Sequence, residues 1–257
     1  MSAAASAGPW PTRVRVGWAG DGVCAKELTP GDFLTPRLLG RCGRHVRIAL
    51  VGHQAMLLAG DRLELDVEVG AGVHLELVEP SGTVAYNARG GRATSSVRVK
   101  VGAGGSLTWR SAPFVIADGA DVDRDLDVAL DEGGIAAFRE TVVLGRHAED
   151  GGSLLSRQRV TLGGAPLLVE TLDLRDPAAR ALPGMLGPHR VVATAMLLGL
   201  PAGTEVGPGT TPLAGPGLLA RALTGAAHEA DQLLAGTWSA WLGEVAAHFS
   251  LIHEEPR

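Results

Sequence analysis

The stretch Leu63-Glu-Leu-Asp-Val-Glu-Val69, followed by Gly70-Ala-Gly72 and then by Val73-His-Leu-Glu-Leu77, decides the fold class. Its apolar residues alternate with polar ones at a period of two, which is typical of strands with one buried face. The glycines between the two runs indicate a tight turn. The stretch therefore predicts a strand, a turn and a second strand.

The same pattern recurs further along the chain, with turns at Gly102, Gly133 and Gly163. Counted from Gly70, successive turns are 32, 31 and 30 residues apart. A period near 31 residues over four copies is typical of stacked supersecondary units. The 36 glycines and 15 prolines fit many short elements joined by turns. We therefore predict a mainly β chain, organised as a β-helix-like stack of strand hairpins.

The outward residues of the first strand in each copy change sign from copy to copy. They are Glu64, Asp66 and Glu68, then Arg98 and Lys100, then Asp125 and Asp127, and finally Arg157 and Arg159. Opposite charges that face each other across neighbouring strands stabilise a sheet, whereas like charges repel. The alternation favours stacking of the copies in chain order. The alternative is that these residues are ordinary solvated faces.

The C-terminal part changes character after the Pro/Gly-rich stretch Leu200–Gly217. Apolar residues from Ala230 to Val245 recur at three- and four-residue steps, which predicts an amphipathic helix of about five turns. The face formed by Trp238, Trp241 and Leu242 either packs into the core or binds a partner. Both interpretations stay open from the sequence.

The length of 257 residues, 46% of them hydrophobic, is enough for one large domain with its own core. We expect a single domain over residues 1–257. Its parts would be a flexible tail (1–12), a stacked β-repeat body (13–199), and a C-terminal part (200–257) that holds a Gly/Pro-rich connection, a strand and the helix.

The composition disfavours several classes of function. With 23 Lys+Arg against 28 Asp+Glu the net charge is −5, which gives no footprint for nucleic acid. Neither Lys26 nor Lys100 follows a glycine, so the chain has no P-loop. No signal peptide is expected, and the apolar run Val191–Leu200 is too short to span a membrane. Cys24 and Cys42 suit reduced thiols, so we expect a cytoplasmic protein.

Catalytic and metal-binding motifs are also missing. The chain has no G-x-S-x-G elbow, and its eight histidines show none of the spacings of zinc motifs. We expect no enzyme activity and no tightly bound cofactor. A transient nickel site could still be assembled in space from histidines and carboxylates, which suit this metal.

Several blocks of the sequence resemble, in order and spacing, the urease accessory protein UreD family, called UreH in some bacteria. They are Leu57–Gly72, Thr83–Tyr86, Val101–Trp109, Glu140–Arg146, Leu167–Leu174 and Gly217–Leu223. The resemblance covers about residues 25 to 247. The chain departs from the family at Pro80–Tyr86, where the family's Gln and Lys are absent.

The resemblance implies a function that residue chemistry alone does not supply. Family members are non-enzymatic scaffolds that, with the accessory protein UreF and the GTPase UreG, dock on urease apoprotein and help insert nickel into its metallocentre. The family fold is a β-helix-like stack with two helices. Its members are thought to carry nickel through an internal, water-filled passage lined by polar residues.

Five residues that match the family are candidates for lining this nickel path: Asp61, Tyr86, Glu140, Arg146 and Glu170. Glu140 and Glu170 come first, because a carboxylate inside a β stack needs hydrogen bonds, a cation or hydration. The alternative is a buried ion pair with an arginine such as Arg146. The nickel ligands themselves are not assigned.

Two other functions stay open from the sequence. A β-solenoid-like carbohydrate-active enzyme would use paired carboxylates such as Glu140 on one face of the stack. An oligomeric interaction module would use the helix that carries Trp238 and Trp241.

Overall fold

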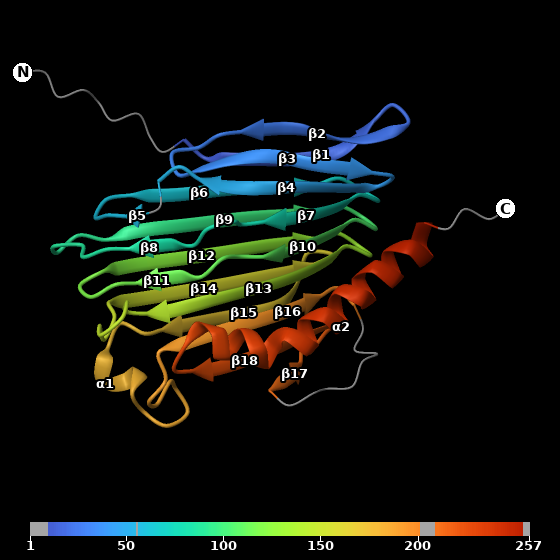
Figure 1. The fold of residues 1–257 in the computed structure, drawn as a ribbon. Coiled ribbons are helices and arrows are strands. Elements are labelled where there is room, and N and C mark those ends of the chain that lie inside the picture. Colours follow the sequence, from blue (N-terminus) through green and yellow to red (C-terminus); the bar gives the residue numbers. More distant parts are fainter. Residues whose placement is uncertain (1–9, 55, 201–208, 254–257) are drawn as a thin grey trace, which may run out of the picture.

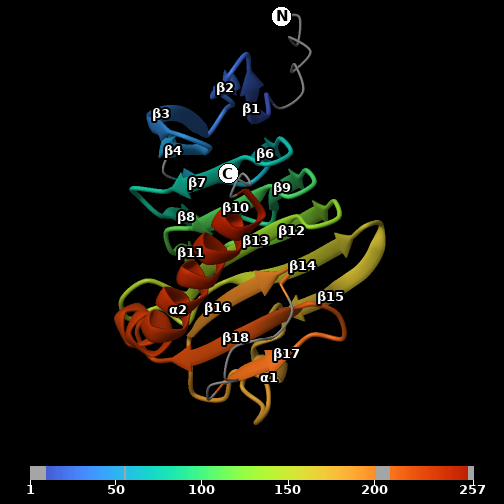
Figure 2. The same cartoon turned by 90° about the vertical axis from the view of Figure 1, so that its right-hand side faces the viewer.

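The computed structural model describes residues 10–54, 56–200 and 209–253, which form two facing β-sheets with a long helix outside one of them (Figure 1; Figure 2). Sheet A runs β15 (Ala165–Asp173), β14 (Ser153–Leu162), β12 (Asp121–Leu130), β9 (Ala93–Val101), β6 (Arg62–Val69), β1 (Thr12–Ala19) and β2 (Gly22–Thr29). Sheet B runs β17 (Thr210–Pro212), β18 (Gly217–Thr224), β16 (Val191–Leu198), β13 (Ile135–Leu144), β10 (Ser106–Arg110), β7 (His74–Val78), β4 (His45–Gly52) and β3 (Leu34–Cys42). Short strands beside this path are β5 (Met56–Leu57), β8 (Thr83–Ala85) and β11 (Phe114–Ile116).

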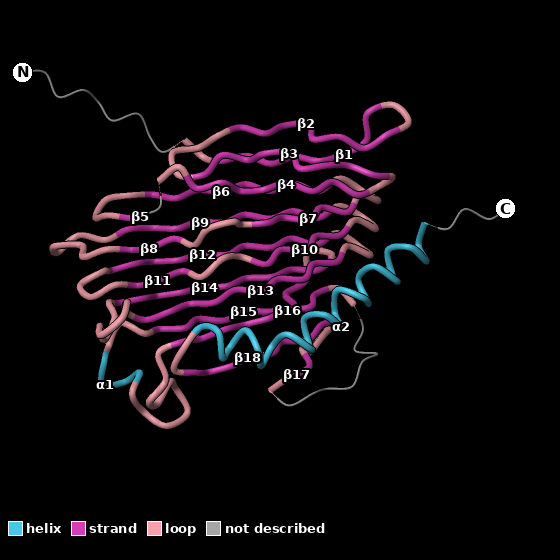
Figure 3. Tube along the Cα trace, in the orientation of Figure 1, coloured by secondary structure: helices cyan, strands magenta, loops and turns pink. Residues whose placement is uncertain are grey.

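The β-helix-like stack predicted from the repeat is confirmed. Equivalent strands of successive copies pair in parallel and in chain order, β6 with β9, β9 with β12 and β12 with β14 in sheet A. In sheet B, β7 pairs with β10 and β10 with β13, also in parallel. Figure 3 shows these strands side by side, with the turns gathered at the two ends of the strands.

The expectation of hairpins is wrong for the first three copies. The two strands of one copy, such as β6 and β7, lie in opposite sheets, so the turn at Gly70 is an arch across the core. An arch lets both apolar faces turn toward the same interior, which a flat hairpin does not. The fourth copy is a true hairpin, because β14 and β15 pair antiparallel. Its turn residues Gly163 and Gly164 both have positive φ, as such a turn requires.

The alternating charges face each other as predicted. Asp66 lies opposite Arg98, Arg98 opposite Asp127, and Asp127 opposite Arg159. Arg98 donates to Asp66 at 2.8 Å, and Arg159 lies 3.5 Å from Asp127. Stacking in chain order therefore places Asp66, Arg98, Asp127 and Arg159 each beside a charge of opposite sign on the next strand.

The core between the sheets is built from columns of apolar side chains. One column contains Val14, Val67, Val99, Val128 and Val160, which occupy paired positions on neighbouring strands of sheet A and are almost fully buried. A second apolar cluster, with Leu57, Ile116, Val122 and Leu154, fills the other end of the strands. The two clusters leave a layer between them, where the candidate functional site lies.

The C-terminal helix is present and longer than predicted: α2 spans Ala227–His253, and the short helix α1 spans Pro177–Arg180. Trp238 and Trp241 are 8% and 2% exposed and pack with Leu242 against β16 and β18. The face that the sequence offered for partner binding is therefore covered by sheet B in this chain. Neither α1 nor α2 is long and apolar enough, in its described residues, to cross a membrane.

An ion pair between a buried arginine and a half-exposed aspartate fixes α2 to sheet B. Arg139 of β13 is 3% exposed and donates to the carboxylate of Asp231 at 2.6 Å and to its backbone carbonyl at 3.0 Å. Parts of the expected domain lie outside the described residues, namely positions 1–9 of the tail and 201–208 of the connection.

The charge ladder gives a first prediction. Arg98→Glu places a negative charge between Asp66 and Asp127, and should lower the free energy of unfolding by about 1 kcal/mol in urea titrations at low salt. The loss should shrink in 1 M NaCl, because salt screens exposed charges. The control Arg37→Glu lies opposite Ala49 on an edge strand and should change little. Equal effects of both variants would contradict the ladder.

Candidate functional site

Polar side chains replace apolar ones along the inner face of sheet A between the two apolar clusters. Ser95, Arg124 and Ser156 occupy paired positions on β9, β12 and β14. Because parallel strands in register bring equivalent positions together, three polar residues on three copies form one continuous polar row. Gln158, two positions after Ser156 and 7% exposed, extends the row.

Sheet B is interrupted at the same level. β10 pairs with β13 up to Arg110 and Arg139, and the pairing resumes with β11 only at Phe114 and Val142. The preceding copy has the same interruption, because β7 ends before residues 79–82 and β8 begins after them. Glu140 of β13 therefore lies beside a gap in the ladder.

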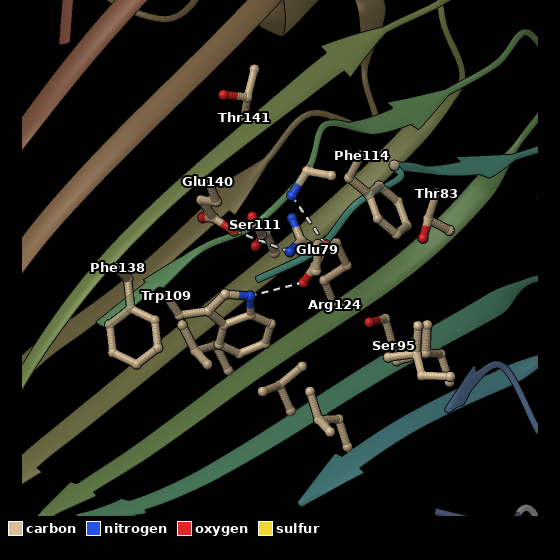
Figure 4. A pocket seen from close by; sticks show the side chains of 18 of the residues that line it. Glu79, Thr83, Ser95, Trp109, Ser111, Phe114, Arg124, Phe138, Glu140 and Thr141 are labelled. Carbon is tan, nitrogen blue, oxygen red and sulfur yellow. Dashed lines mark hydrogen bonds and ion pairs between the residues drawn. The ribbon is translucent and has the colours of Figure 1, made fainter. Parts of the chain in front are cut away.

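Glu140 crosses the interior from sheet B to sheet A. Its Oε2 accepts from Arg124 at 3.0 Å, and its Oε1 accepts from Gln158 at 2.7 Å. The guanidinium of Arg124 also lies over the Phe114 ring, at 4.7 Å from its centroid. Figure 4 shows Arg124 and Glu140 pointing toward each other across the cavity.

Glu170 makes a second ion pair between the sheets. Both of its oxygens accept from Arg221 of β18, at 3.0 and 2.7 Å, and Arg221 also donates to Thr194 of β16 at 3.3 Å. A bidentate pair of this kind satisfies both partners inside the protein. Glu140 and Glu170 are thus both partly buried, with side chains 17% and 26% exposed, and both are paired with an arginine. These arginines are Arg124 and Arg221, not Arg146.

A cavity of about 90 Å³ runs between the sheets, from Gly52 and Gln54 near β4 to Glu140 on β13. A second, separate space of about 10 Å³ lies beside it, against Glu170 and Arg221. Both spaces are lined by Glu140, Ser156 and Gln158. Gln158 Oε1 and Arg124 Nη1 are buried without a partner among the described residues. Buried polar atoms of this kind are normally satisfied by water or a bound polar group.

Glu79 is a further carboxylate of this cavity that the sequence analysis did not single out. It accepts from Trp109 Nε1 at 2.9 Å and from the backbone N–H of Ala112 at 3.1 Å. Burial raises the pKa of the Glu79 carboxyl from 4.5 to about 7, although these two hydrogen bonds oppose the shift. The side chain lies at the centre of Figure 4.

The other predicted residues lie at the turns, away from this cavity. Asp61 accepts from the backbone N–H of Leu58 at 2.7 Å and so shapes the turn before β6. The Arg146 guanidinium lies 5.1 Å from the centroid of the Tyr86 ring and donates to Glu149. Arg146 thereby lowers the pKa of the Glu149 carboxyl to about 2. Asp61, Tyr86 and Arg146 are not among the residues that line the described cavity.

Sequence reasoning also missed Arg124, Gln158 and Arg221. The signal for Arg124 was its position in the strand. It lies midway between Val122 and Leu126, two residues from each, and therefore shares their inward face of β12. Arginine in the apolar phase of a strand indicates an interior polar partner. The partner itself could not be read, since Glu140 lies on the opposite sheet.

The fold and this interior define a β-solenoid-like protein with a polar, charge-balanced layer between two sheets. A family model described as UreD urease accessory protein matches residues 39–252. The chain belongs to this family.

Several relatives support the assignment. Urease accessory protein UreD 1 of Streptomyces griseus subsp. griseus is 48% identical over 220 residues, which is 86% of this chain and 86% of that protein. Urease accessory protein UreD 1 of Saccharopolyspora erythraea is 34% identical over 233 residues, covering 86% of this chain and 91% of that protein. UreD of Frankia alni is 37% identical over 203 residues, covering 68% of this chain and 67% of that protein.

The raised pKa of Glu79 makes stability depend on pH. The folded chain keeps this proton up to pH about 7, whereas the unfolded chain releases it near 4.5, so stability is full below 4.5 and falls as pH rises toward 7. Glu79→Gln should remove this fall, which is at most about 3 kcal/mol. Urea unfolding at pH 5, 6, 7 and 8 measures it.

The matched control for this measurement is Glu68→Gln, which removes a carboxylate from the outer face of β6, where it pairs with Arg15. It should leave the pH profile of the wild-type chain nearly unchanged between pH 5 and 8. A Glu79→Gln profile that runs parallel to the wild type would contradict the assignment.

Proposed function

We propose that this chain is a non-enzymatic scaffold of urease maturation that acts in the cytoplasm with UreF and the GTPase UreG. In this proposal it docks on urease apoprotein and assists nickel insertion, with nickel as its cargo and not as a resident cofactor. The observation that carries the proposal is the group of polar and charged side chains, Arg124, Glu140, Ser156 and Gln158, that lies between the sheets beside two neighbouring interior spaces. Membership of a family of urease accessory proteins supports the same role.

The path would run across the strands, between the sheets. It begins near Gly52 and Gln54, passes Glu79 and Glu140, and continues through Ser156 to Glu170. Apolar clusters lie on both sides of it along the strands. A row of polar side chains between apolar walls would confine a cation to one direction.

The charges along the path are balanced, which suits transfer better than storage. Glu140 is paired with Arg124, and Glu170 with Arg221. A carboxylate already held by a guanidinium binds a passing cation weakly, and conduction requires weak binding at several sites. Glu140 and Glu170 would therefore guide nickel without trapping it.

The pairings disfavour the carbohydrate-active enzyme. Both oxygens of Glu140 accept hydrogen bonds from Arg124 and Gln158, and both oxygens of Glu170 accept from Arg221. A glycosidase needs one carboxyl group free to donate a proton and a second free to attack or to activate water. Neither of these side chains meets that requirement in this arrangement.

The test measures nickel in urease purified from cells that carry the urease operon with Glu140→Gln, Glu170→Gln or both. Each single change should lower nickel per urease active site several-fold, and the double variant should lower it further. Glu149→Gln, which breaks the exposed pair with Arg146, is the control and should leave the nickel content unchanged.

Tagged chain should also recover UreF-type and UreG-type proteins and urease subunits in the same cells, for the wild type and both single variants. Retained complexes with low nickel would locate the defect in transfer. Normal nickel content in the double variant, from a complex that assembles, would refute the proposed role of the interior.

A further inference from the structure

The outer face of sheet A carries a hollow of about 420 Å³ beside the charge ladder. Helix α2 packs against sheet B and leaves this face of sheet A open (Figure 2). The charged side chains that line the hollow are the cations Arg15, Arg98, Lys100 and Arg159 and the carboxylates Asp66, Glu68 and Asp127. Four cations against three carboxylates leave one positive charge in excess.

A second row of outward residues runs beside the charge ladder, and its charges stop alternating part of the way across the sheet. Arg15, Glu68, Lys100, Ala129 and Thr161 occupy paired positions on five neighbouring strands. The first three alternate in sign, as the residues of the ladder do. The fourth position, where continued alternation requires a carboxylate, is an exposed alanine. At this position β12 therefore offers Lys100 no negative charge.

Lys100 is the cation in excess. Its neighbour Glu68 is held from the other side by Arg15, at 3.2 Å. Arg98, two positions before Lys100 on the same strand, binds Asp66 at 2.8 Å. Among the cations that line the hollow, and within the described residues, Lys100 is the one that forms no ion pair.

Arg159 is a second cation beside the alanine, and it is only partly neutralised. It lies 3.5 Å from Asp127, and its side chain remains 69% exposed. On its other side it faces Val169 of β15, which is 68% exposed. Arg159 therefore has a carboxylate on one neighbouring strand, whereas Arg98 lies between Asp66 and Asp127.

We propose that this hollow is a docking surface for an acidic segment of a protein partner, one carboxylate of which lies over Ala129, between Lys100 and Arg159. The inference rests on the proposed function, because the partner would be one of the proteins of urease maturation. The alanine side chain is a single methyl group, so a side chain of the partner can reach the strand there. Its carboxylate would continue the alternation of charge across the sheet. Complementary charges of this kind steer association and select the partner.

The surroundings of the hollow favour a protein segment over a nucleic acid. A nucleic acid brings a row of phosphates, which the three carboxylates that line the same hollow would repel. A single carboxylate matches the single excess charge. The exposed side chain of Val169, next to Arg159, adds an apolar contact that a protein segment can cover.

The variant Ala129→Glu supplies the missing carboxylate from the chain itself. It should pair with Lys100, so its midpoint of urea unfolding should equal or exceed that of the wild type. The partner's carboxylate would then meet a like charge, so binding of one partner should fall at least about fivefold. Lys100→Glu should weaken binding of the same partner to a similar degree. Arg62→Glu reverses a charge on the same face outside the hollow and is the matched control.

The measurement is the recovery of urease subunits, UreF-type protein and UreG-type protein with tagged full-length chain, from cells that carry the urease operon. Ala129→Glu and Lys100→Glu should lose the same partner, and Arg62→Glu should recover all that the wild type recovers. Wild-type recovery of every partner by both hollow variants, or an equal loss in Arg62→Glu, would overturn the docking surface.

A short peptide tests the hollow without the maturation proteins. The probe is N-acetyl-Val-Glu-Val amide, titrated into the ¹⁵N-labelled full chain. It should shift the backbone amide resonances of Lys100 and Ala129 in the wild type and not in Lys100→Gln, and the Val-Gln-Val counterpart should shift neither. Absence of these shifts would refute the site. Equal shifts with inorganic phosphate would show a site for any small anion and would overturn the assignment to a protein segment.

The two proposals can fail separately. If the wild-type chain recovers its partners and the hollow variants recover them equally, the scaffold function stands and the docking surface is refuted. If the wild-type chain recovers none of these proteins, the scaffold function is refuted, and the peptide titration alone decides whether the hollow binds a carboxylate.

Discussion

The structure depends on the parallel, in-register stacking of equivalent strands. Because each copy repeats the phase of the one before it, a residue type at one position becomes a column across the sheet. The valines from Val14 to Val160 form such a column, and the alternating charges from Asp66 to Arg159 form another on the outer face. Columns of apolar residues make the core continuous. In the same way, polar residues at equivalent positions of successive copies form a continuous polar row inside it.

The interior layer follows from that constraint together with the gap in sheet B. Ser95, Arg124 and Ser156 line up on sheet A at the level where β10 gives way to β11. Glu140 reaches across from β13 and closes the layer with an ion pair. A polar layer of this kind costs stability relative to an apolar one, since buried ions lose their hydration. Its hydrogen bonds and ion pairs offset part of this cost, and its position between two dry clusters is what the proposed transfer of a polar cargo requires.

The stack could be predicted because the turn spacing and the alternation of charge both repeat along the chain, so a single sequence is enough to detect them. The sequence did not distinguish an arch from a hairpin, because both have the same pattern of a strand, a glycine turn and a second strand. Glu140 and Glu170 were found through the family resemblance. Their partners Arg124 and Arg221 were not, because pairing across the sheets depends on which strands face each other. Glu79 was missed for a different reason: its partners Trp109 and Ala112 come from the next copy in the same sheet, about thirty residues further along the chain.

One measurement tests the central claim that the interior is the route of the cargo. Ser156 is 8% exposed and lines both interior spaces, so Ser156→Leu fills their junction without changing the outer surface. Ser156→Ala is the control that keeps the space open. We predict urease with severely reduced nickel from Ser156→Leu and normal nickel from Ser156→Ala, each with its partner complex intact. Normal nickel content behind a filled junction would contradict the account.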